Sequence, residues 1–214
     1  VSNRKGRAHF RIEVEGRGAH AGSAFRNGAS AVWQLARVID RAMGLTDLEK
    51  GVTVNVGPVS GGLVVNRVAH SAMAEGEMRA FDMEQYRRTL DQLLALGGTG
   101  DVVAASDRFP CRVTVSVIQE IPPWPANPGT ERLVAVWKEA AACCGLGFNA
   151  VPRGGLSDGN WIWERFPTLD GLGPQGGNAH VSERSADGLK TPEFVNLASL
   201  VPKALLNCLA IQRL

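Results

Sequence analysis

The chain has 214 residues, of which 44% are hydrophobic and 21% are charged, and its formal net charge is +2 at pH 7. This is the composition of a globular protein that can bury a sizeable core. The nearly neutral balance gives no reason to expect nucleic acid or a membrane as partner. No apolar run approaches the roughly 20 residues of a membrane-spanning helix. Four cysteines without a CxxC pair favour a reducing, cytoplasmic setting.

The first 120 residues predict a regular succession of strands and helices. Residues 8–15 alternate between apolar and polar side chains, the period of a half-buried strand. A helix then runs to a stop at Gly44, two strands flank the Gly61-Gly62 turn, and a second helix ends at Gly97-Gly98. Alternating valines at 113–117 predict the last strand. The predicted helix faces consist of Val32, Leu35, Ala36, Ile39 and Met43, and of Tyr86, Leu90, Leu93 and Leu94.

This β-α-β-β-α-β order predicts an α+β, ferredoxin-like domain, in which one sheet is backed by two helices. We assign it to residues 6–118. The architecture by itself indicates no activity, because many unrelated functions share it.

The second part of the chain, residues 119–214, has a different character. Four prolines between positions 121 and 128 predict an extended connector. Two helices follow, separated by Gly-rich loops and short strand-like segments at 148–151 and 168–171. Because such helices need a sheet to cover, and because the chain begins with Val1 rather than Met, we expect missing strands to precede Val1. The helices are defined by Leu133, Val136, Trp137, Ala140 and Ala141, and by Phe194, Leu197, Val201, Leu205 and Cys208.

Two histidines in Gly-rich turns are the leading candidates for chemistry. His20 lies between Gly18 and Gly22, and His180 follows Gly176-Gly177. Glycine allows tight turns from which an imidazole projects, and imidazole is the commonest metal ligand and acid–base group near neutral pH. The alternative for each is a turn histidine that only hydrogen-bonds to backbone. Arg79, at the end of a predicted strand, is either a carboxylate clamp or a solvated arginine.

A possible nucleophile motif lies in residues 155–159, which match the G-x-S-x-G pattern around Ser157, with Asp170 and His180 following in the order of a serine hydrolase. That motif requires a buried strand immediately before the serine, whereas Pro152 and Arg153 stand there. The acid and the histidine also follow within 23 residues, which leaves little room for the strands of that fold. The competing interpretation is a Gly-rich turn that opens a helix.

Together these segments resemble the dinuclear zinc amidohydrolase family that includes glutamate carboxypeptidase, acetylornithine deacetylase, succinyl-diaminopimelate desuccinylase and aminoacylase. Residues 6–118 resemble its lid, or dimerisation domain, and residues 119–214 resemble the C-terminal segment of its α/β catalytic domain. The matching segments are the His20 loop (16–22), the G-G-x-x-x-N run ending at Asn66, the D-x-R-like strand 77–79, the Gly-rich substrate loop 154–159 and the G-P-x-G-G-N-x-H run 173–180.

The chain departs from the family pattern at several positions. The proline and acidic residue usual after the lid asparagine are Ala69 and His70, the first position of D-x-R is Glu77, and Glu183 follows His180 by three residues instead of four. The family's H-x-D ligand pair, bridging aspartate and Glu-Glu pair belong upstream of the lid, and nothing in this sequence matches them.

The resemblance implies that the complete enzyme is a homodimer that uses two zinc ions to hydrolyse an amide bond in a carboxylate-bearing N-acyl amino acid or small peptide. It implies a zinc-ligand role for His180 and, for His20, a hydrogen bond to the oxyanion in the partner subunit's site. Asn66, Arg79, Gly155 and Ser157 would bind substrate. We expect the isolated chain to be inactive and to bind zinc weakly, because one histidine cannot form a two-zinc site. The alternative is a non-catalytic dimerisation or ligand-binding module.

Overall fold

The computed structural model describes residues 1–185, 188–189 and 191–214. The chain divides into two compact units, each with its own core. The sheet unit comprises residues 3–125 and 153–161. The helical unit comprises residues 1–2, 126–152 and the described part of 162–214.

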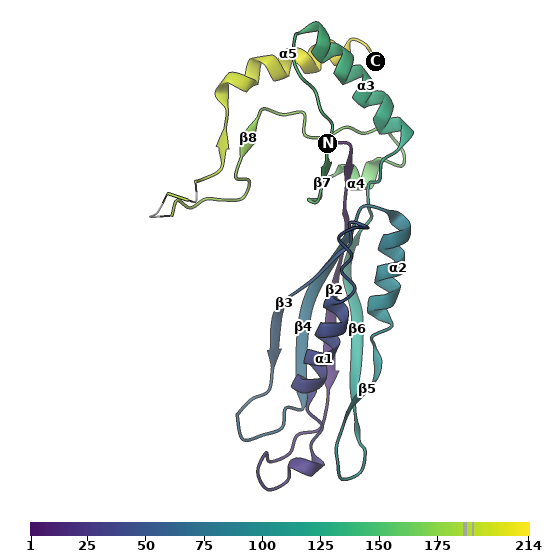
Figure 1. Ribbon diagram of the computed structural model, residues 1–214, viewed down its shortest axis with the longest axis vertical. Helices are drawn as coiled ribbons and strands as arrows, with labels where there is room; N and C mark the ends of the chain where they lie inside the picture. Colours follow the sequence, from purple (N-terminus) through teal and green to yellow (C-terminus); the bar gives the residue numbers. More distant parts are fainter. Residues whose placement is uncertain (186–187, 190) are drawn as a thin grey trace. The chain divides into compact units, whose positions relative to one another are not determined.

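The sheet unit is built on five antiparallel strands in the order β3-β4-β2-β6-β5 (Figure 1). The central strand β2 (Gly6–Glu15) pairs with β4 (Ser71–Ala80) on one side and with β6 (Pro110–Ile121) on the other. The edges are β3 (Thr53–Gly61) and β5 (Gly98–Val103). Each strand predicted within the first 120 residues is present, and β5 is a further strand that the sequence did not predict.

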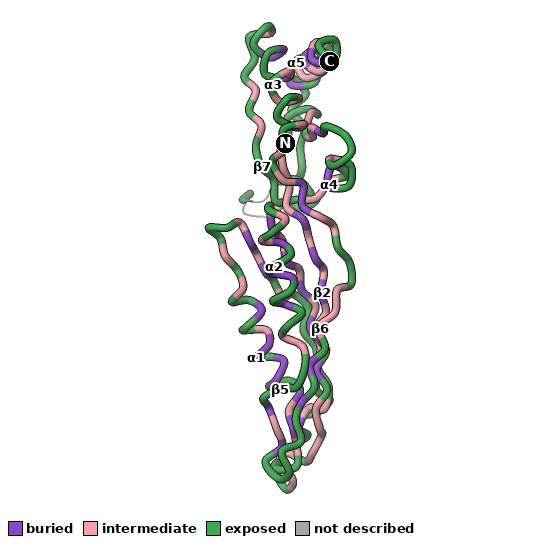
Figure 2. The backbone as a smooth tube through the Cα atoms, turned by 90° about the vertical axis from the view of Figure 1, so that its right-hand side faces the viewer, coloured by how far each residue is buried: buried purple, intermediate pink, exposed green. Residues whose placement is uncertain are grey.

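Two helices form a layer on one face of this sheet (Figures 1 and 2). Helix α1 (Ala31–Met43) begins after Ser30, whose hydroxyl accepts the Trp33 N–H at 3.3 Å. Helix α2 (Met83–Leu94) begins after Asp82, whose carboxylate accepts the Gln85 N–H at 2.9 Å. Such N-caps satisfy backbone donors that the first helical turn leaves unpaired. The short 3-10 helix η1 (Phe25–Asn27) precedes α1.

The alternation of β2 decides which face is covered. Ala8, Phe10, Ile12 and Val14 are fully buried under the helices, whereas the intervening arginines, histidine and glutamates lie on the open face. Successive side chains of a strand point to opposite faces, so one alternating segment supplies both the core and a charged surface. The predicted half-buried strand is therefore correct.

The stripe of α1 that contacts the sheet differs from the predicted one. The buried residues are Ala31, Gln34, Leu35, Val38 and Ala42. Val32, Ala36 and Met43, which the prediction placed in the core, are exposed, and Leu94 of α2 is exposed as well. Helix α1 carries apolar residues on more than one side, and helical spacing alone cannot tell which side meets the sheet.

The helical unit has a small core between α3 (Pro128–Cys143) and α5 (Leu200–Ile211). Trp137 is almost fully buried, and its indole N–H donates to Asn207 Oδ1 at 2.9 Å. Asn127 caps α3 by accepting the Thr130 N–H at 2.9 Å. The remaining buried members of this core are Ala140, Ala141, Leu206 and Ala210.

Three predictions for this unit are wrong. Residues 148–151 and 168–171 form no strand, and α5 begins only at Leu200. Pro202 has no N–H and is tolerated only in a first helical turn, which fixes this start. Phe194 therefore lies in β9 (Phe194–Val195), which pairs with β8 (Gly176–Gly177), and Leu197 lies in the 3-10 helix η2 (Leu197–Ser199). Three of the residues that defined the predicted helix are exposed in α5: Val201, Leu205 and Cys208.

The proline-rich segment after β6 is anchored rather than being a free connector. Trp124 is fully buried and exchanges backbone hydrogen bonds of 2.8 and 3.0 Å with Arg4 of β1 (Asn3–Arg4). Lys5 donates its N–H to the carbonyl of Arg153, which ends β7 (Pro152–Arg153), at 3.2 Å. The short helix α4 (Gly159–Ile162) follows. Among the described residues, no helix combines the length and the apolar character needed to cross a membrane.

Candidate functional site

The loop between β2 and α1 presents His20 at the surface of the sheet unit. The His20 side chain turns back on its own loop, so that its Nδ1 accepts the backbone N–H groups of Gly22 and Ser23, both at 3.1 Å. The carbonyl of His20 accepts the Ala24 N–H at 3.0 Å, which closes the turn around the ring. The ring position is thus set by local backbone contacts, and Nε2 is the nitrogen left to face a ligand.

A backbone ladder joins the His20 loop to the loop that carries Asn66. The Ala21 N–H donates to the Asn66 carbonyl at 2.8 Å, and the Val68 N–H donates to the Ala19 carbonyl at 2.8 Å. The loops follow the end of β2 and precede the start of β4, where Glu15 pairs with Ser71. The structure therefore brings His20 and Asn66 together, and both residues are exposed.

Arg79 lies at the opposite end of β4. At about 3.4 Å per residue, this ten-residue strand separates it from the Asn66 loop by roughly 30 Å. Its Nε and Nη2 donate to the two carboxylate oxygens of Glu77 at 2.8 and 3.0 Å, and Nη1 donates to the Gly154 carbonyl at 2.9 Å. A guanidinium has five N–H donors, so these contacts use three and leave one on each Nη atom for a further carboxylate.

Arg79 also affects the charge of its surroundings. Burial lowers the pKa of Lys5, and the nearby positive charge of Arg79 lowers it further. The Lys5 ammonium donates to Thr53 Oγ1 at 3.4 Å and lies 5.4 Å from the centre of the Phe81 ring. Two positive charges therefore lie near each other at this end of the sheet, and that of Arg79 is paired with the Glu77 carboxylate.

The Gly-rich loop 154–159 is held by its carbonyls and by a turn hydroxyl. Arg4 Nη1 donates to the Gly155 carbonyl at 2.8 Å. Ser157 Oγ accepts the Gly159 N–H at 3.2 Å, and the Ser157 N–H donates to Asn160 Oδ1 at 3.0 Å. Ser157 thus caps the turn that opens α4. The only strand just before it, β7, has two exposed residues, so the buried strand of a nucleophile elbow is missing there.

Asn160 is a buried residue that the sequence analysis overlooked. Besides accepting the Ser157 N–H, its Nδ2 donates to the carbonyls of Lys5 and Pro122 at 3.1 and 2.9 Å. One side chain therefore connects three backbone segments and fixes the Gly-rich loop to the sheet unit. An asparagine beside glycine and serine reads as ordinary turn composition, so the sequence held no signal for this role.

His180 lies in the helical unit, in the loop that the β8–β9 pair closes. It is exposed and has a left-handed backbone, with φ of 68°, as does Asn178 with φ of 57°. Asn178 Nδ2 donates to the Thr191 carbonyl at 3.0 Å, across the base of this loop. A left-handed conformation is unusual for residues other than glycine, and such positions cluster at functional sites.

The described residues do not form a metal site by themselves. Within 1–185, 188–189 and 191–214, no three histidine, cysteine, aspartate or glutamate side chains gather closely enough to hold a metal ion. His180 is a ligand of suitable chemistry, but one imidazole supplies a quarter of the usual four-coordinate shell of zinc.

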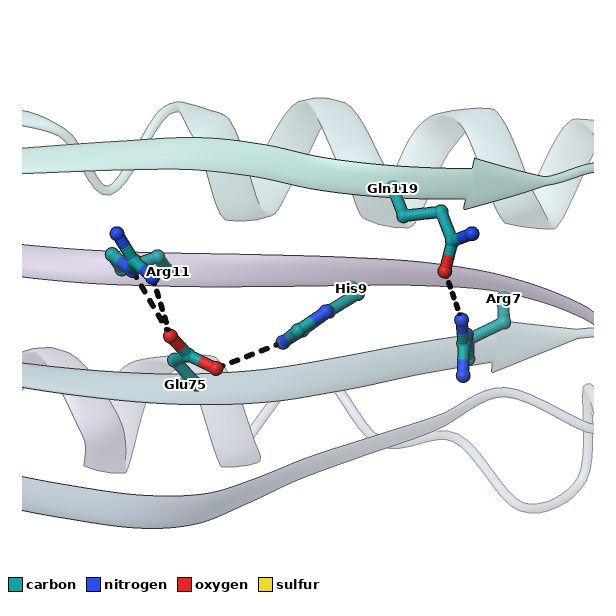
Figure 3. A network of polar contacts seen from close by, with 5 residues as sticks. All are labelled: Arg7, His9, Arg11, Glu75 and Gln119. Atoms are coloured by element: carbon teal, nitrogen blue, oxygen red, sulfur yellow. Dashed lines mark hydrogen bonds and ion pairs between the residues drawn. The ribbon is translucent and has the colours of Figure 1, made fainter.

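The open face of the sheet carries a polar network away from these loops (Figure 3). Glu75 accepts Arg11 Nε and Nη2 at 3.1 and 2.7 Å, and its other oxygen lies 3.1 Å from His9 Nε2. The Arg11 hydrogen bonds are the main reason why the pKa of Glu75 is lowered. Arg7 donates to Gln119 beside them. His9 is therefore part of this polar network.

Comparison with known proteins assigns the class of this fold. Residues 2–96 match the family model described as the peptidase dimerisation domain of M20 peptidases. The resemblance to peptidases and amidohydrolases found in the motifs is confirmed over this region. Its fold class is accordingly a dimerisation domain of mixed α and β content.

Solved structures with similar folds cover nearly all of the chain. Aminopeptidase PepT from Bacillus cereus is 24% identical with a TM-score of 0.75, over 99% of this chain and 52% of that one. A tripeptidase from Staphylococcus aureus is 26% identical with a TM-score of 0.67, over 100% and 51%. An aminobenzoyl-glutamate utilization protein from Klebsiella pneumoniae is 19% identical with a TM-score of 0.55, over 77% and 43%.

The chain spans about half the length of the aminopeptidase and tripeptidase structures. No curated protein matches it.

Proposed function

We propose that this chain is the dimerisation domain and the closing catalytic segment of a zinc-dependent hydrolase that cleaves an amide bond in a small peptide or N-acyl amino acid with a free carboxylate. The observation that carries this proposal is the dimerisation-domain match over residues 2–96, together with the His20 and His180 loops of the same family pattern. We assign residues 6–118 to a ferredoxin-like lid and residues 119–214 to the catalytic domain. The names of the aminopeptidase and the tripeptidase favour a small peptide as substrate.

Dimerisation through the lid is supported by what α1 leaves uncovered. Trp33 of α1 is 58% exposed, and Val32, which lies against Gly61 of the edge strand β3, is 43% exposed. Exposed apolar groups of this size commonly mark protein–protein contacts. A second copy of the lid would bury them, which makes a homodimer the simplest assembly.

The placement of the candidate residues supports a site shared between subunits. His20 and Asn66 are at one end of the sheet and Arg79 is at the other, roughly 30 Å away by the length of β4. One small substrate cannot contact both ends of the same lid. We assign Arg79 to the substrate carboxylate in one subunit, and His20 with Asn66 to the reacting amide and nearby polar groups in the partner's site.

The metal requirement rests on the family, whose members are generally metal-dependent. The described residues do not by themselves form a two-zinc site. His180 is proposed as one zinc ligand, with the others from outside this chain. What this chain's residues do is bind and orient: Arg79 holds the carboxylate, Gly155 and Ser157 line the substrate loop, and His20 donates a hydrogen bond as the amide oxygen gains charge.

The test uses the natural gene product with a tripeptide and with an N-acetyl amino acid. We expect chelation to abolish hydrolysis and zinc to restore it. We expect His20→Ala to lower kcat by about 100- to 1000-fold, the usual value of an oxyanion donor, and Arg79→Ala mainly to raise KM. His70→Ala, a histidine of the same unit without an assigned role, is the control. Unchanged kinetics in either site variant would remove that residue's role.

Two other functions have distinct signatures. Hydrolysis that is indifferent to chelators and lost in Ser157→Ala would favour the serine hydrolase, although Ser157 caps a turn in this structure. A natural product that dimerises but hydrolyses neither substrate, with or without zinc, would favour the dimerisation or ligand-binding module.

A further inference from the structure

The contacts of the His20 ring determine more than its position. The Gly22 and Ser23 amides both direct their hydrogens at Nδ1, at 3.1 Å each. The ring nitrogens of a neutral imidazole differ, because one carries a hydrogen and the other accepts. A nitrogen that accepts two N–H groups cannot be the one that carries the hydrogen.

We propose that the backbone amides of Gly22 and Ser23 are positioning groups that hold neutral His20 in the tautomer with its proton on Nε2, so that His20 acts as a hydrogen-bond donor. This proposal rests on the proposed function only for what Nε2–H meets, namely the oxygen of the amide being cleaved. The tautomer itself follows from contacts within residues 20–24.

The same contacts exclude two other roles for a neutral His20. A metal ligand or a general base needs a lone pair on Nε2, which places the hydrogen on Nδ1 facing an acceptor, usually a carbonyl or carboxylate. Here Nδ1 faces two donors. Acceptance at Nδ1 also polarises the ring and strengthens the Nε2–H as a donor, by roughly 10–30% per hydrogen bond in condensed-phase estimates.

The contacts to Nδ1 come from the loop's own backbone. The Ala24 N–H donates to the His20 carbonyl at 3.0 Å, which closes a turn over residues 21–23. In this turn the Gly22 and Ser23 amides point at the ring, whereas the Ala21 N–H donates to the Asn66 carbonyl. A Cβ on Gly22 would lie 3.5 Å from the nearest ring atom, an ordinary contact. The contact with the ring therefore depends on the direction of the two N–H groups and not on the absence of a side chain at Gly22. Removing one N–H group consequently tests the contact.

The experiment is nitrogen-15 NMR of the imidazoles in the 214-residue chain, at a pH where the rings are neutral. We expect His20 to show one tautomer, protonated on Nε2. Ser23→Pro deletes one of the two donors, and Ser23→Ala keeps it as the matched control. We expect a larger share of the Nδ1–H tautomer in the proline variant and none in the alanine variant, with His70 as an internal reference.

In the natural gene product, Ser23→Pro should lower kcat by about 2- to 10-fold, the rate equivalent of one hydrogen bond, and Ser23→Ala should not. A wild-type His20 with the proton on Nδ1, or a tautomer ratio that Ser23→Pro leaves unchanged, overturns the proposal. If His20 is an Nε2–H donor and the natural product hydrolyses no amide, the proposed function fails and the tautomer assignment stands. If the natural product hydrolyses the amide while His20 carries its proton on Nδ1, the tautomer assignment fails and the proposed function stands.

Discussion

Asn160 offers the sharpest test of how the Gly-rich loop is held. Its carboxamide makes three hydrogen bonds: Oδ1 with the Ser157 N–H at 3.0 Å, and Nδ2 with the carbonyls of Pro122 and Lys5 at 2.9 and 3.1 Å. The side chain is only 1% exposed. In Asn160→Ala the three backbone partners, which lie in a partly buried region, lose this side chain.

The expected cost follows from those contacts. A typical hydrogen bond contributes about 0.5–1.5 kcal/mol, so three amount to roughly 1.5–4.5 kcal/mol, and the cost rises toward the upper end where a partner stays buried and unsatisfied. Because the hydrogen bonds connect residues 157, 122 and 5, the lost free energy should mainly weaken the attachment of the Gly-rich loop 154–159 to the sheet unit. Asn160→Asp keeps the acceptor but turns an oxygen toward two carbonyls, so it should be at least as destabilising as Asn160→Ala.

Urea unfolding of the chain measures the free-energy difference, and amide hydrogen exchange locates it. We expect faster exchange in residues 153–161, with the centre of the sheet less affected. The matched control is Asn55→Ala, an exposed asparagine of β3, which should change stability by less than about 0.5 kcal/mol. A loss below about 1 kcal/mol in Asn160→Ala, or exchange equal to that of the control, would refute this account of the loop.

Two further predictions concern the sheet unit. A Cβ at Gly76 of β4 would lie 2.5 Å from both the Asn55 carbonyl oxygen and the Phe10 ring. Gly76→Ala should therefore cost about 1–3 kcal/mol in urea unfolding, whereas Gly57→Ala, with nothing within 4 Å of its Cβ, should cost little; equal effects would contradict the packing argument. The pKa of Asp107 is lowered to about 2, first by its Arg17 hydrogen bonds and then by the Phe109 N–H. Because this pKa is lower in the folded state than in the unfolded chain, the stabilisation is present above about pH 4 and is lost as the pH falls to about 2. The difference in unfolding free energy between wild type and Asp107→Asn should shrink as the pH falls through that range. Curves of stability against pH that stay parallel for the two proteins would contradict this role of Asp107.

The sequence predicted those strands and helices whose pattern is set within a single segment. The apolar–polar alternation in β2 and the end of α1 before Gly44 depend on residues that are close in sequence, and the structure agrees with both predictions. Strand β5 was missed because its sequence, GTGDVV, has no alternation. Its pairing with β6 and the buried hydrogen bond from the Val102 N–H to Gln34 Oε1, at 2.8 Å, are long-range interactions.

The predictions of which helix face is buried were wrong for a related reason. Helices α1 and α5 carry apolar residues on several sides, and a helix buries whichever side its neighbour covers. In α1 the sheet covers Leu35 and Val38 and leaves Trp33 exposed. In α5, contact with α3 buries Leu206, while Val201 remains 76% exposed. The sequence pattern of a helix does not specify where the sheet or helix that packs against it will lie.

The sequence by itself singled out His20, Asn66, Arg79 and His180, because glycine-flanked histidines and a strand-end arginine are chemically distinctive wherever they lie. Only the tertiary structure decided that the His20 and Asn66 loops are joined by backbone hydrogen bonds, and that β4 holds Arg79 at the far end of the sheet. It alone identified Asn160, whose three partners come from separate parts of the chain. Residue type determines what a side chain can do, whereas distance and burial, which determine what it meets, arise from packing between segments remote in sequence.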